Sequence, residues 1–165
     1  MQYQQFTPEM RKTHTILVPN MLPIHFRLLI SIFGQFGYHM ELLESSSRTV
    51  VEEGLKNVHN DTCYPALLVV GQFIEALKSG KYDPDKTALL ITQTGGGCRA
   101  SNYIHLLRKC MAQQFPQVPV ISLNFAGLEK ASGFQLTLPL CIKLVYGVLY
   151  ADLLMTCLLY TSDAA

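Results

Sequence analysis

Along this chain, short apolar runs of strand length alternate with longer segments that show helical periodicity. The clearest buried strand is TALLITQ at residues 87–93, and three more are predicted at 14–20, 38–44 and 118–124. Helices are predicted at 23–37, 45–58, 65–79, 99–114 and from residue 138 onward. Strands and helices that alternate in this way form mainly parallel sheets flanked by helices, so the sequence predicts the α/β fold class.

The composition is that of one folded domain. Of the 165 residues, 49% are apolar and 15% are charged, and the net charge is +1. A chain of this length forms about one domain, which we expect to span residues 10–155. No cluster of Lys and Arg supplies the field that nucleic-acid binding needs. The N-terminus lacks the apolar run of a signal peptide, which favours the cytoplasm.

The apolar segment at 144–160 raises the question of a membrane helix. It is shorter than the roughly 20 residues that a spanning helix needs. Asp152 lies near its middle, where a charge in a bilayer costs about 3 kcal/mol. We therefore expect a buried core helix and no membrane contact.

The stretch TQTGGGCRASNY, residues 92–103, is the first candidate site. It leaves a predicted strand at its carboxyl end, where loops of parallel sheets build binding sites. The phosphate-binding pattern G-x-x-x-x-G-K-[ST] is absent, and Ala100 stands where G-x-G-x-x-G needs its last glycine. The free amides of a helix N-terminus, helped by Arg99, could still hold an anion.

A thiolate accounts for more of these residues. Cys98 stands at the start of a predicted helix, where the helix dipole favours the ionised thiol, and Gly95, Gly96 and Gly97 leave backbone amides free to approach a sulfur. Cys63 likewise lies between a polar loop and a helix that begins near Pro65. Two such cysteines could meet at one rim of the sheet and bind a metal or an iron–sulfur centre.

Two other interpretations of these cysteines stay open. Each could be a small buried apolar residue. One of them could also be a nucleophile with His59 or His105 as its base. For the other three cysteines, which lie in apolar helical segments, the sequence favours burial; these are Cys110, Cys141 and Cys157.

Three segments together resemble a known family. HNDTCYPALLVVGQFIEAL, LLITQTGGGCRASNYIHLLRK and VPVISLN are similar to the 2-hydroxyacyl-CoA dehydratase and acyl-CoA dehydratase activase-related proteins, over residues 10–155. The resemblance implies a Rossmann-like fold and a [4Fe–4S] cluster bound by Cys63 and Cys98. It also implies electron transfer from an ATP-hydrolysing activase, in support of radical dehydration of a 2-hydroxyacyl-CoA.

The resemblance carries further expectations. The partner is an activase domain or a sister dehydratase subunit, with an acyl-CoA as substrate, although the activase's own ATP-binding motifs have no counterpart here. Arg99 either offsets the charge of the cluster, meets an acyl-CoA phosphate or is a solvated residue of the first helical turn. The third cysteine of the dehydratase subunits has no clear counterpart, since Cys141 lies within an apolar run. A docking or assembly module without chemistry is the alternative function.

The two ends of the sequence also carry an expectation. FTPEMRKTHTILVPN resembles the interior of a longer protein, and the tail at 157–165 resembles translated sequencing adapter. We therefore expect a truncated domain, in which the last helix has lost partners and exposes apolar surface.

Overall fold

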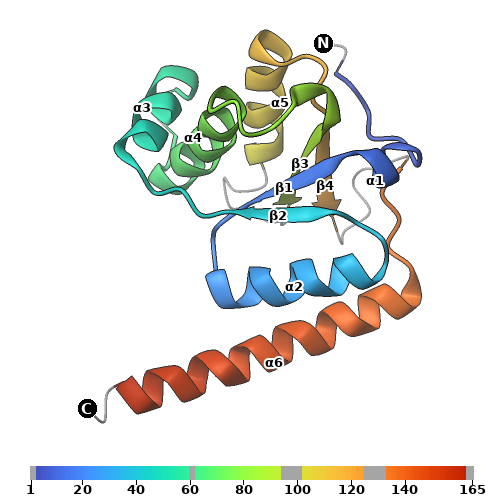
Figure 1. Cartoon of the computed structure of the whole chain (residues 1–165). Coiled ribbons are helices and arrows are strands. Elements are labelled where there is room, and N and C mark those ends of the chain that lie inside the picture. Colours follow the sequence, from blue (N-terminus) through green and yellow to red (C-terminus); the bar gives the residue numbers. More distant parts are fainter. Residues whose placement is uncertain (1–2, 60–61, 94–101, 125–132, 163–165) are drawn as a thin grey trace.

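The predicted α/β fold class is confirmed. The computed structural model describes residues 3–59, 62–93, 102–124 and 133–162. Within these ranges, four parallel strands form one sheet in the order β2-β1-β3-β4 (Figure 1). The strands are β1 (Thr15–Pro19), β2 (Met40–Leu43), β3 (Thr87–Gln93) and β4 (Val120–Asn124).

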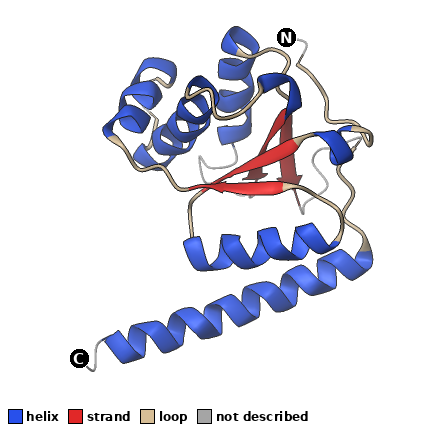
Figure 2. Ribbon diagram, in the orientation of Figure 1, coloured by secondary structure: helices blue, strands red, loops and turns tan. Residues whose placement is uncertain are grey.

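Helices cover both faces of this sheet (Figure 2). One layer contains α3 (Arg48–Asn57), α4 (Tyr64–Lys78) and α5 (Tyr103–Gln114), and the other contains α2 (Pro23–Gln35) and α6 (Leu138–Ser162). Successive strand residues point to opposite faces. Leu17 therefore joins the core under α4 and α5, while Ile16 and Val18 join the core under α2. The two-sided burial explains why the central strands β1 and β3 are mostly apolar rather than alternating.

The order of the strands places a switch point in the middle of the sheet. From β1 the chain passes through α2 to β2 on one side, then returns through α3 and α4 to β3 on the other side of β1. Loops that leave β1 and β3 at their carboxyl ends therefore diverge from each other. In open parallel sheets this divergence opens the crevice in which ligands bind.

Two close helix contacts hold α4 in place. A Cβ built on Gly71 of α4 would lie 2.0 Å from the backbone oxygen of Val50, and a Cβ on Gly54 of α3 would lie 2.4 Å from the backbone oxygen of Leu67. The two helices thus meet backbone to backbone. Glu53 of α3 adds an ion pair to Lys78 of α4, with 2.6 Å between Oε2 and Nζ.

The expectation of a buried C-terminal helix is wrong for most of α6. Its buried residues are Leu140, Leu144 and Ala151, and its exposed large side chains are Leu138, Ile142, Val145, Tyr146, Val148, Leu149, Tyr150, Leu153, Leu158, Leu159 and Tyr160. An unbroken apolar pattern shows that a helix needs partners but not whether the chain supplies them. Exposed apolar surface on this helix was expected of a truncated domain, and the truncation itself stays a prediction.

The charge within α6 has a partner on α2. Asp152 Oδ1 lies 2.8 Å from Nε2 of His25, a buried residue of α2. Close packing accompanies this contact, because a Cβ on Gly147 would lie 2.5 Å from Cδ1 of Ile32. By length and composition α6 could also cross a membrane, so the absence of a membrane segment stays a prediction.

Two short elements were not predicted. The four-residue helix α1 (Met10–Thr13) precedes β1, and the single 3-10 turn η1 (Pro84–Lys86) precedes β3. Elements of three or four residues are shorter than the window over which periodicity can be recognised. In η1 the N-cap is Asp83, whose Oδ1 accepts a hydrogen bond from the Asp85 amide at 3.0 Å.

Substituting Gly71 tests whether the α3–α4 contact holds α4. Gly71→Ala is expected to lower the free energy of unfolding by about 3 kcal/mol, because the new methyl group meets a backbone carbonyl. Gly34→Ala is the matched control, since Gly34 is a helical glycine with nothing within 4 Å of its built Cβ. It should raise the free energy of unfolding by about 0.5 kcal/mol. Urea denaturation measures both, and equal effects would contradict the packing argument.

Candidate functional site at the carboxyl edge of the sheet

Gln72 of α4 ties together the loops that leave β1 and β2. Its Nε2 donates a hydrogen bond to the carbonyl oxygen of Ser45 (3.0 Å), and its Oε1 accepts one from the Asn20 amide (3.2 Å). A second tie runs from Ser45 Oγ to Glu75 Oε2 at 3.1 Å. Because Gln72 is buried, these bonds are shielded from water and fix both loops relative to α4.

Asn20 stands directly after β1, beside the switch point of the sheet. Its side-chain oxygen Oδ1 is buried and accepts no hydrogen bond within the described part of the structure. A buried carboxamide oxygen without a donor costs free energy. The carboxyl edge therefore offers an acceptor that a bound polar group could satisfy.

Cys63 is the N-cap of α4 and lies at the same edge. Its carbonyl oxygen accepts hydrogen bonds from the amides of Ala66 (3.0 Å) and Leu67 (3.3 Å), which start the helix. The side chain is half-buried. Its sulfur therefore stands at the positive end of the α4 dipole, as the sequence predicted from Pro65 in the first turn.

The sulfur of Cys63 contacts the helix that follows the glycine stretch. Cys63 Sγ lies 2.7 Å from the hydroxyl oxygen of Tyr103, the first residue of α5 and a buried side chain. Either atom can donate in this hydrogen bond. When the thiol is ionised, the hydroxyl must be the donor, and it then stabilises the thiolate. A thiolate with this support is suited to bind a metal or to act as a nucleophile.

Five of the six predicted site residues lie outside the described residues. They are Gly95, Gly96, Gly97, Cys98 and Arg99. The structure does describe both flanks of their segment, Gln93 at the end of β3 and Asn102 before α5. The meeting of Cys63 with Cys98 therefore stays a prediction. Among the described ranges, no group of three or more His, Cys, Asp or Glu side chains could hold a metal ion.

The other cysteines divide between the two helical layers. Cys110 is buried in α5, as predicted, and its Sγ donates a hydrogen bond to the carbonyl oxygen of Asn57 at 3.1 Å. Burial raises the pKa of the Cys110 thiol. Cys141 is half-buried, and Cys157 is exposed. The prediction of burial is wrong for Cys157, because the end of α6 has no partner in the described structure.

The two candidate bases for a cysteine nucleophile are surface residues. His59 and His105 are both exposed, and His105 lies on α5 two residues after Tyr103. The Cys63 sulfur contacts the Tyr103 hydroxyl rather than either histidine in the contacts that the structure describes.

Sequence reasoning missed three residues of this edge. Gln72 and Tyr103 lie within the predicted helices at 65–79 and 99–114, and neither residue was given a role from the sequence. Their polar atoms on otherwise apolar stripes were the available signal, since buried polar groups need partners. Asn20 was interpreted only as the end of a strand.

In comparisons with family models, curated proteins and solved structures, nothing matches the chain. The family resemblance of the cysteine segments therefore stays a prediction, and the site must be judged on its own chemistry.

Replacing Tyr103 tests its role beside the Cys63 sulfur. Tyr103→Phe removes the hydroxyl group that hydrogen-bonds to the Cys63 sulfur and keeps the aromatic ring in the core. Alkylation of Cys63 by iodoacetamide at pH 7 should slow roughly tenfold, because a hydrogen bond to a charged group contributes about 1.5 kcal/mol or more. Peptide mapping by mass spectrometry follows each thiol, with the exposed Cys157 as the internal reference. An unchanged ratio of Cys63 to Cys157 labelling would contradict this role.

Proposed function

We propose that this chain is the iron–sulfur cluster-binding domain of a protein related to the 2-hydroxyacyl-CoA dehydratases and their activases. The observation that carries the proposal is the contact between Cys63 and Tyr103. It places a half-buried sulfur against α5, and Cys98 precedes Tyr103 by only five residues in the sequence. Cys63 and Cys98 are the proposed ligands.

The surroundings of Cys63 fit a thiolate ligand of a cluster. Its sulfur is at a helix N-terminus and beside a hydroxyl donor, and both features favour the negative charge that a metal ligand carries. A [4Fe–4S] cluster bound there would accept and pass on single electrons. Gly95, Gly96, Gly97 and Arg99 would then offer amides and a positive charge to the bound group.

The chain by itself offers two thiolates to such a cluster. Cys110 is engaged in the core with the Asn57 carbonyl. The helix α6, which carries Cys141 and Cys157, lies beyond α2 on the opposite side of the sheet from α4 (Figure 1). In this proposal the remaining ligands come from another part of a longer parent protein, a sister subunit, a small molecule or solvent. The proposal therefore includes a partner, either a sister dehydratase subunit or an ATP-dependent activase domain, in the cytoplasm.

The second candidate function is a docking or assembly module without chemistry. The exposed apolar side chains of α6 favour it, because monomeric proteins rarely expose a continuous apolar surface of this kind. The two functions differ in whether purified protein binds iron.

Anaerobic reconstitution with iron and sulfide tests the proposed function. The full chain should bind iron and acid-labile sulfide in equal amounts and show the visible charge-transfer absorbance of thiolate-bound iron. Cys63→Ser and Cys98→Ser should each abolish both. Cys157→Ser is the matched control, because Cys157 is exposed at the far end of α6, and it should bind iron like the parent chain.

Two outcomes would contradict the cluster. A parent chain that stays free of iron after reconstitution would favour the docking module, and binding of that iron-free chain to an activase domain would support it. Equal loss of iron in Cys63→Ser and Cys157→Ser would show that the iron is bound without a specific site.

A further inference from the structure

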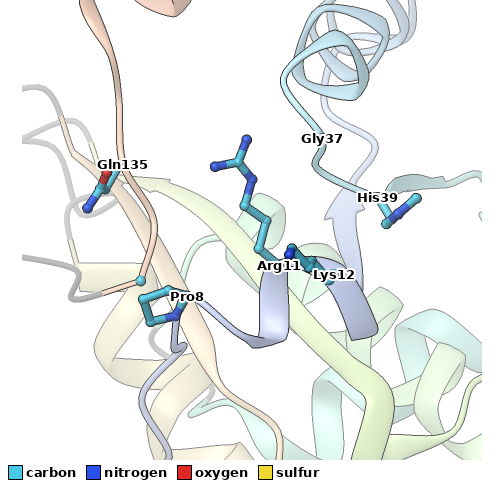
Figure 3. Close-up of a pocket in the computed structure, with 7 residues that line it drawn as sticks. Pro8, Arg11, Lys12, Gly37, His39 and Gln135 are labelled. Carbon is cyan, nitrogen blue, oxygen red and sulfur yellow. The ribbon is translucent and has the colours of Figure 1, made fainter.

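A second site lies at the opposite edge of the sheet. A pocket of about 470 Å³ opens where α1 precedes β1 and where the chain enters β2. Figure 3 shows the Arg11 side chain standing between Gln135 on one side and Gly37 and His39 on the other. Its volume lies within the range of small-molecule sites, and it shares no lining residue with the Cys63 edge.

Basic side chains dominate the lining of this pocket. Arg11 and Lys12 come from α1 and His39 from the turn before β2. None of the described lining residues is acidic, and neither Arg11 nor Lys12 forms an ion pair with any residue in the described ranges. Glu9, the nearest acidic residue in sequence, is exposed and does not line the pocket.

A buried tyrosine, rather than a carboxylate, positions Arg11. The Arg11 Cζ lies 4.4 Å from the centre of the Tyr38 ring. Tyr38 is itself fixed, because its hydroxyl donates to the Gln135 carbonyl oxygen and accepts from the Gln135 amide, each at 3.2 Å. A guanidinium stacked on a ring keeps its positive charge and leaves N–H donors in its plane for a ligand.

Gly37 brings backbone close to the same guanidinium. Its backbone φ angle is +78°, a value that residues other than glycine rarely adopt. A Cβ built on Gly37 would lie 3.4 Å from Arg11 Nη2. His39 is anchored beside it, since its carbonyl oxygen accepts a hydrogen bond from the Ile16 amide at 2.7 Å. The turn and α1 thus hold three basic groups around one space.

We propose that this pocket binds a small, multiply charged oxyanion, the chemistry presented by a phosphate ester or a polycarboxylate. Arg11 supplies paired N–H donors to such oxygens, Lys12 adds a second positive charge, and His39 adds a ring nitrogen. This pocket lies at the opposite edge of the sheet from Cys63, so an anion bound in it would not contact the proposed cluster ligands.

Nuclear magnetic resonance locates the binding site, and titration calorimetry measures the affinity for each anion. Inorganic phosphate, pyrophosphate and citrate are added to the iron-free full chain at constant ionic strength. At least one of them should shift the amide signals of Gly37 and His39, and stronger binding of pyrophosphate or of citrate decides between the phosphate and polycarboxylate sources. Cys63→Ser should bind the same anion equally, which separates this test from that of the cluster.

Variants of the basic residues complete the test. Arg11→Gln should weaken binding by about tenfold or more, since a charge-assisted paired contact is lost. Lys12→Gln leaves the contact between Arg11 and Tyr38 intact and should weaken anion binding to a smaller extent. This variant keeps the test valid if Arg11→Gln fails to fold. Arg48→Gln, an exposed cation on α3 in the other layer, should have no effect. Unmoved Gly37 and His39 signals, or equal weakening by Arg48→Gln, would overturn the proposal.

Discussion

The parallel pairing of β1 with β2 on one side and with β3 on the other decides where the rest of this chain lies. Because all four strands run in the same direction, each connection between consecutive strands must return across a face of the sheet. The loops after β1 and β3 then open at one edge, and the turns before β1 and β2 gather at the other. Cys63 lies at the first of these edges, and the basic pocket around Arg11 lies at the other.

The position of α4 connects packing with the proposed chemistry. Close glycine contacts with α3 fix the helix, and its N-terminus then presents Cys63 to Tyr103. Further along the same helix, Gln72 binds the loops after β1 and β2. A site built on a rigid helix end is better ordered than one that depends on loops alone. Cys63 is thus held by the core, although it lies at a rim.

Local patterns predicted part of the fold, as two cases show, and two other features lay beyond them. TALLITQ has an apolar centre, ALLI, between threonines, so β3 was placed at its observed bounds. Pro65 marked the start of α4 near residue 64. The contact of Cys63 with Tyr103 joins residues 40 positions apart and has no local signature. The exposure of α6 depends on which partners are present, and no pattern within that helix contains this information.

The basic pocket was not predicted from the sequence for the same reason. Arg11 and His39 look like scattered surface residues until α1 and the turn at Gly37 bring them together. The cysteine site was predicted from topology, namely that loops at the carboxyl ends of parallel strands share one edge. Its second half, Cys98, still rests on that rule alone.

The central claim is that Cys63 and Cys98 meet at the carboxyl edge of the sheet. Dibromobimane, which becomes fluorescent and links two thiols only when they are close, tests this in the folded, iron-free chain. Peptide mapping should find the bridge between the Cys63 and Cys98 peptides, and its yield should collapse in urea. Separate labelling of Cys63 and Cys98 in the native chain, with no bridged peptide, would contradict the account.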